Sequence, residues 1–99
     1  MQEMDKALAA LAWYSESEYS KFRTLSADPE VWCQDYESWK SKAEDLIRNL
    51  RREGTEAVKV SLTFAEVEKW CTIQGTQNDA SSRSKLAATK LRDDFEAGS

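Results

Sequence analysis

The chain has 99 residues, of which 40% are hydrophobic, 32% charged and 10% aromatic, a mixture that excludes a disordered chain and predicts one domain over residues 1–99. Its formal net charge of −4 argues against a protein that coats nucleic acid, because that task needs Lys and Arg to neutralise phosphates. The charge is uneven, since residues 1–37 hold 8 of the 18 acidic residues but only 3 of the 14 basic ones, so a basic face in the second half stays open.

The first predicted element covers residues 7–14. Its alanines and leucines favour a helix, but the run is short and stops at a strong helix-start signal. That signal is a capping box from Ser15 to Glu18, and a second box from Thr63 to Glu66 follows another apolar run 48 residues later. This parallel favours a strand over residues 7–14, with a helix as the alternative.

The next segment is predicted to be a helix over residues 16–26, with Tyr19 and Phe22 on one face. Asp28 and Pro29 then restart the chain, because Asp caps helices well and proline is tolerated at the first helical position. We expect one helical turn there that presents Trp32 inward.

The longest predicted helix covers residues 36–53, with Asp35 as its cap and Gly54 as its left-handed stop. The amphipathic spacing of this helix defines its buried stripe, formed by Tyr36, Trp39, Ala43, Leu46, Ile47 and Leu50. A strand follows over residues 58–62, where apolar and polar side chains alternate.

Two more helices are predicted, one from Thr63 to Gly75 and one that starts near Ala80 with Asp79 as its cap. The outer face of the last helix is predicted to carry Arg83, Lys85, Lys90 and Arg92. The fold class is therefore α+β and mainly helical, with two strand-helix-helix units in the order β-α-α-β-α-α. Because two strands alone make a marginal sheet, either the four helices cover one of its faces well or a second chain contributes strands, and the second alternative, dimerisation, is favoured.

Candidate chemical sites are few. The chain has no histidine, and Cys33 and Cys71 lie too far apart for zinc-ligand spacing, so we expect no metal, no cofactor, no catalytic residue and two reduced, buried thiols. Five carboxylate pairs exist, but most sit at helix starts, where backbone amides explain them: Glu16/Glu18, Asp28/Glu30, Asp35/Glu37, Glu66/Glu68 and Asp93/Asp94.

The aromatic residues offer the best ligand-binding candidates, since aromatic-lined concavities are typical of small-molecule pockets. The simpler interpretation is an aromatic core. The candidates nearest loops or element ends are Trp13, Tyr14, Trp32 and Trp39.

The order of aromatic motifs resembles a pattern in small, uncharacterised bacterial proteins of similar length. The motifs are Trp13-Tyr14-Ser15-Glu16-Ser17-Glu18-Tyr19, Tyr36-Glu37-Ser38-Trp39, and Val58-Lys59-Val60 leading to Trp70-Cys71 and Gly75. The resemblance implies a compact bacterial cytoplasmic domain and brings no activity or functional residue with it.

These observations favour a non-enzymatic interaction module, homodimeric and cytoplasmic, that binds another protein or itself. The alternative is a small-molecule binding domain with an aromatic pocket. We expect no signal peptide and no membrane span, because no apolar run is long enough to cross a bilayer. A nucleic-acid partner is disfavoured by the acidic total.

Overall fold

The computed structural model describes residues 7–97, with side chains as far as Asp93. It has the predicted mainly helical α+β architecture, and residues 7–14 contribute a strand, not the alternative helix. The elements are β1 (Ala7–Trp13), α1 (Glu16–Leu25), the 3₁₀ turn η1 (Pro29–Val31), α2 (Tyr36–Arg52), β2 (Thr55–Ser61), α3 (Phe64–Gln74) and α4 (Ala80–Ala97).

The two strands lie side by side and parallel. Their register pairs Ala7 with Thr55 and continues unbroken to Trp13 and Ser61. Every pair is separated by the same 48 residues as the two capping boxes. The repeat in the sequence is therefore also the register of the sheet.

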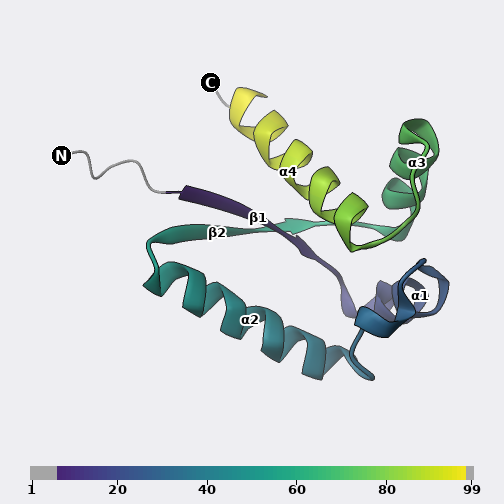
Figure 1. Cartoon of the computed structure of the whole chain (residues 1–99), viewed down its shortest axis with the longest axis horizontal. Helices are drawn as coiled ribbons and strands as arrows, with labels where there is room; N and C mark the ends of the chain where they lie inside the picture. The colour runs from purple at the N-terminus through teal and green to yellow at the C-terminus, as the bar shows by residue number, and fades with distance from the viewer. Residues whose placement is uncertain (1–6, 98–99) are drawn as a thin grey trace.

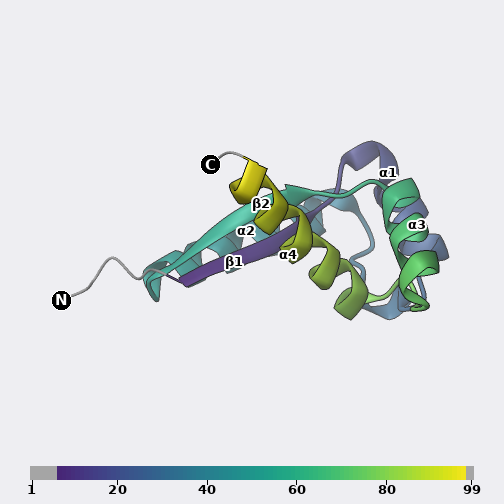
Figure 2. The same cartoon turned by 90° about the horizontal axis from the view of Figure 1, so that it is seen from above.

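The helices cover both faces of this sheet. α2 packs mainly on β2 and α4 mainly on β1, and Figure 1 shows these two helices on opposite sides of the strands. α1 and α3 lie next to each other beyond the carboxyl ends of the strands, as both views show (Figures 1 and 2).

The core lies between the sheet and α4 and extends into the space between α1 and α3. Phe22 and Val67 are fully buried there, and Leu86 and Ala87 of α4 belong to the same cluster as Val60 of β2. The face of β1 toward α4 contributes alanines, which allow this helix to approach closely.

Most predicted helix ends are confirmed. Thr63 and Glu66 form a complete capping box, in which the Thr63 hydroxyl accepts from the Glu66 amide at 3.2 Å and the Glu66 carboxylate accepts from the Thr63 amide at 2.7 Å. Asp35 accepts from the Ser38 amide and Asp79 from the Ser82 amide. Gly75, with φ at 72°, ends α3 in the left-handed conformation.

The other capping box does not close, which corrects the sequence prediction. The Ser15 hydroxyl makes no cap bond and lies 3.1 Å from the Ser17 hydroxyl. Glu18 instead accepts from the amide of Phe64 at 2.9 Å. Its carboxylate thus stabilises the start of α3, where the orphan amides and the helix dipole favour a negative charge.

Asp28 also caps a helix that is remote in the sequence. It makes no side-chain cap bond to η1, the turn it was predicted to cap. Its carboxylate accepts from the Ala80 amide at 2.8 Å and so caps α4. Trp32 does lie inward as predicted, directly after η1.

The two capping boxes give a matched pair of variants. Thr63→Ala should lower the free energy of unfolding by about 0.5–2 kcal/mol, because the Glu66 amide loses its hydroxyl acceptor. Ser15→Ala should change it by less than about 0.5 kcal/mol, because Ser15 makes no cap bond. Urea unfolding of both variants measures the difference, and equal losses would contradict the asymmetry.

A second prediction concerns acid stability. Hydrogen bonds from the amides of Ser38 and Ser82 lower the pKa values of Asp35 and Asp79 below 3.8. Each group therefore adds stability that is present above pH 3.8 and is lost as pH falls through its lower folded pKa. Asp79→Asn keeps an oxygen acceptor but does not titrate, so its stability should fall less steeply below pH 3.8. Denaturant unfolding across that range tests this, and an unchanged slope would refute it.

Candidate functional site

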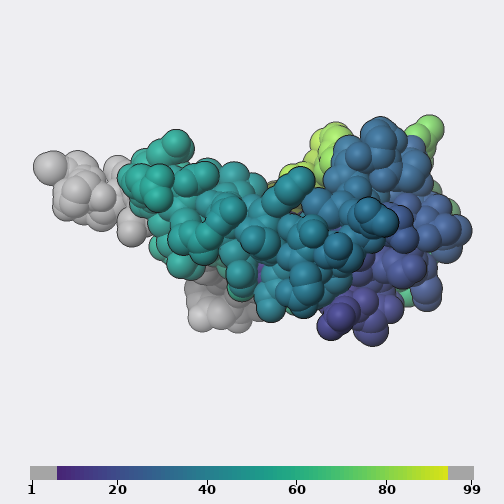
Figure 3. Space-filling view, turned by 90° about the horizontal axis from the view of Figure 1, so that it is seen from below, coloured from purple at the N-terminus to yellow at the C-terminus, as the bar shows by residue number. Residues whose placement is uncertain are grey.

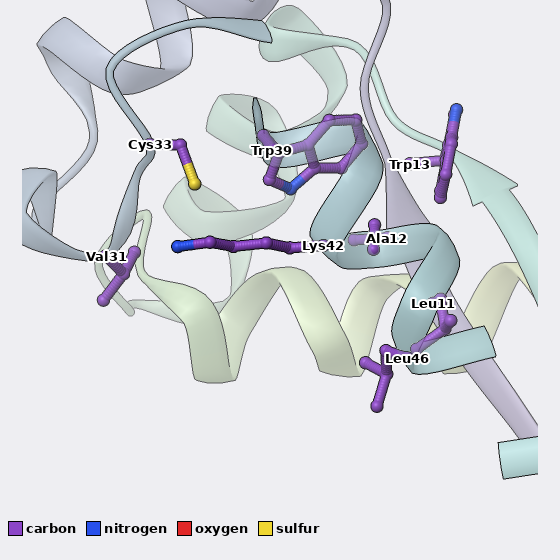
Figure 4. A pocket seen from close by; sticks show the side chains of 9 residues that line it. Leu11, Ala12, Trp13, Val31, Cys33, Trp39, Lys42 and Leu46 are labelled. Carbon is purple, nitrogen blue, oxygen red and sulfur yellow. The ribbon is translucent and has the colours of Figure 1, made fainter. Parts of the chain in front are cut away.

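An open groove lies between β1 and α2. It has a volume of about 330 Å³, and Figure 4 shows its side chains, while Figure 3 views the molecule from the α2 side. The groove is mainly apolar. Its lining consists of Leu11, Ala12, Trp13, Val31, Cys33, Trp39, Lys42, Ala43 and Leu46.

Three segments build this groove. Leu11 and Trp13 come from the face of β1 that lies toward α2, whereas Trp39 and Leu46 come from one stripe of α2. The ring centroids of Trp13 and Trp39 are 4.9 Å apart at an angle of 57°, a favourable tilted contact. Lys42 lays its aliphatic chain across the groove toward the segment after η1 (Figure 4).

The groove exists because α2 covers β2 and leaves the matching face of β1 partly open. Leu46 remains 47% exposed and Val31 54% exposed, although both border the groove. The sequence assigned Leu46 to a buried stripe. Its helical spacing identified the face correctly, but spacing alone does not reveal where the neighbouring element ends.

The four aromatic candidates separate into two pairs. Trp13 and Trp39 line the groove, whereas Tyr14 and Trp32 do not. Tyr14 is 5% exposed and packs on Phe22 and Trp32 at centroid distances of 4.6 and 4.9 Å. Tyr14 and Trp32 therefore belong to the aromatic core.

Burial also raises the pKa values of two tyrosines. Burial raises the pKa of Tyr14, and the nearby Arg83 guanidinium offsets part of this rise. Burial likewise raises the pKa of Tyr19, whose hydroxyl donates to the Cys33 carbonyl at 2.8 Å. Both phenols are therefore held in their neutral form and act as packing and hydrogen-bonding groups.

The two cysteines have different surroundings, and both are free thiols. Cys71 is buried, and its sulfur lies 3.4 Å from the Gln77 carbonyl oxygen. Cys33 is only half-buried and borders the groove, so the expectation of two buried thiols is right for Cys71 and wrong for Cys33.

Arg83 is the centre of a buried polar cluster. The sequence placed it on the outer face of the last helix, but it is 3% exposed. It forms a double hydrogen bond with the carboxylate of Asp28, at 3.2 Å each, and donates to the Tyr14 hydroxyl at 3.0 Å. It also donates to Asn78 at 2.9 Å and stacks over Trp32 at 4.6 Å.

This cluster changes the interpretation of α4 as a basic helix. Arg83 is turned inward, and Lys90 binds the Glu66 carboxylate at 2.9 Å and the Ser61 carbonyl at 2.7 Å. Of the four cations predicted on the outer face, two are thus engaged within the protein. Lys85 and Arg92 alone provide little positive charge for binding a phosphate backbone.

Five of the ten carboxylates in the predicted pairs have partners within the protein. Glu18, Asp28, Asp35 and Glu66 bind backbone amides at helix starts, and Glu68 accepts from the Asn78 side chain at 2.8 Å. The side chain of Asp94 lies outside the described residues. Within the described part of the chain, no group of three or more potential ligand side chains is placed to hold a metal ion.

Comparisons with family models, curated proteins and solved structures found no match. They therefore add nothing to the resemblance in the aromatic motifs. Among the helices of residues 7–97, none is both long and apolar enough to cross a membrane.

The Arg83 cluster makes a prediction about stability. Arg83→Met should lower the free energy of unfolding by about 3–5 kcal/mol, because it leaves the Asp28 carboxylate without its buried partner. Lys85→Met, an exposed change on the same helix, should cost less than about 0.5 kcal/mol. Urea unfolding compares them, and a small loss for Arg83→Met would show that the ion pair contributes little.

Proposed function

We propose that this protein is a non-enzymatic interaction module that acts as a homodimer in the cytoplasm. The observation that carries the proposal is the open, mainly apolar groove, which adjoins the uncharged strand β1. Monomeric proteins seldom leave such a surface uncovered, since burying it against a partner is favourable.

The composition of β1 strengthens this proposal. Residues Ala7–Trp13 contain no charged side chain, and Leu8 is 52% exposed at the start of the strand. Natural edge strands are usually protected by charges, proline or a bulge, and β1 has an unbroken register without any of these in the described strand.

The packing of the aromatic residues supports a partner more than a small ligand. Tyr14, Tyr19, Phe22 and Trp32 contact one another and fill the core. The concavity that remains is open along one side and bordered by exposed Val31 and Leu46. An open apolar surface of this kind suits a protein partner.

Sedimentation equilibrium at micromolar concentration tests the homodimer. We expect twice the 11.3 kDa mass of one chain. Leu46→Lys should shift the equilibrium toward the monomer, because it places a charge at the border of the groove. Ile73→Lys is the matched control, since Ile73 is 69% exposed on α3 and does not line the groove. A mass of one chain at every concentration would refute the proposal.

A small-molecule binding domain is the second candidate, favoured by Trp13 and Trp39 in the groove with Lys42 beside them. An aromatic anion would match these three side chains, because the rings supply stacking and the ammonium supplies the opposite charge. Anilinonaphthalene sulfonate is a suitable probe. Saturable binding to a monomer that weakens in Lys42→Met would favour this candidate over the dimer.

A further inference from the structure

We infer that two copies of the chain join through the free edge of β1, in an antiparallel register centred on Ala10. This inference rests on the homodimer proposed above and specifies its interface. The result would be one four-stranded sheet in the order β2-β1-β1-β2, with the twofold axis passing between the two Ala10 residues.

The direction of the backbone groups follows from one hydrogen bond. The Trp13 carbonyl accepts from the Leu62 amide at 2.9 Å, so the backbone polar groups of Trp13 face β2. Backbone groups alternate between the two edges along a strand, and the register of β1 is unbroken. Those of Leu8, Ala10 and Ala12 therefore face the outer edge.

The outer edges of the two strands differ. On β2, the Ser61 carbonyl already accepts from Lys90, and the strand carries the charged residues Glu56 and Lys59. On β1, the only outer group with a described hydrogen bond lies just past the strand, where the Tyr14 carbonyl accepts from the Tyr36 hydroxyl. β1 is thus the edge open to pairing.

The side chains of β1 complement a second copy in this register. Antiparallel pairing about Ala10 places Leu8 opposite Ala12, Leu11 opposite Ala9 and Trp13 opposite Ala7 of the other copy. Each large side chain meets an alanine, and Ala10 meets itself. The three outward-facing residues form hydrogen-bonded pairs, which gives six backbone hydrogen bonds across the axis.

Charge favours a second copy of this chain as the occupant. Across a twofold axis the residue on the axis faces its own copy, so a charge there would meet a like charge, which is destabilising on paired strands. β1 carries no charge, so its edge can lie against itself without that cost. The grooves of the two copies lie on the same face of the joined sheet, because an axis perpendicular to the sheet preserves its faces.

Amide hydrogen exchange of the full chain, measured residue by residue across a range of concentrations, tests this interface. The amides of Ala9 and Leu11 face β2 and provide an internal control that should be protected at every concentration. Those of Leu8, Ala10 and Ala12 should exchange rapidly in dilute protein. At a protein concentration 100 times the dissociation constant of the dimer, the exchange of these three amides should slow about tenfold, because mass action leaves few chains as monomers.

An intermolecular contact fixes the register. In a mixed sample of labelled and unlabelled chains, isotope-filtered NMR should show a strong cross-peak between the Hα atoms of Ala9 and Leu11 of different copies. These residues form a close, non-hydrogen-bonded pair in the inferred register. Ala10→Pro should abolish the dimer, because it removes an outward amide that the monomer does not use.

The outcomes separate this interface from the dimer itself. A dimer by sedimentation whose Ala10 and Ala12 amides stay unprotected overturns the β1 interface and leaves the homodimer standing. If the outer-edge amides of β1 are protected but the cross-peaks join residue pairs other than Ala9 and Leu11, the register centred on Ala10 is overturned. A protein that stays monomeric overturns both. If Ala10→Pro does not fold, the exchange and NMR data on the unaltered chain still decide the matter.

Discussion

The parallel pairing of β1 with β2 is the constraint on which the rest of the structure depends. Parallel strands need a long crossover, and here the crossover contains α1, η1 and α2. A sheet of two strands is marginal in water, so its faces need covers. α2 and α4 supply one cover for each face, and the carboxyl ends of the strands lead into α1 and α3, which pack against each other.

Polar contacts then hold the two repeat units together at that end. Arg83 and Asp28 join the start of α4 to the loop after α1, and the Ala27 amide adds a bond to the Asn78 carbonyl at 2.8 Å. Glu18 of the first unit also caps α3 of the second. A buried ion pair is a weak source of stability but penalises any arrangement that separates its partners. It therefore specifies how the two loops meet.

The sequence predicted what depends on neighbours along the chain. Helix spacing, the alternation in β2, the cap at Asp35 and the box at Thr63 all involve residues within a few positions, and each is confirmed. The predictions for Ser15, Asp28 and Arg83 were wrong for a common reason. Each side chain, or its expected partner, binds a group from the other unit, between 46 and 69 residues away. A local pattern identifies a carboxylate that can cap a helix, but not which helix it caps.

The candidate groove has the same physical origin as the open edge. Because α2 lies mainly on β2 and α4 mainly on β1, the sheet is covered unequally, and the face of β1 toward α2 stays partly exposed. The sequence identified Trp13 and Trp39 as candidates from their positions, but the gap between them and Leu46 depends on how far α2 is displaced across the sheet. One added strand beside β1 would satisfy its outward amides and would place apolar side chains next to those of the partly exposed face, which makes the edge and the groove adjoining surfaces.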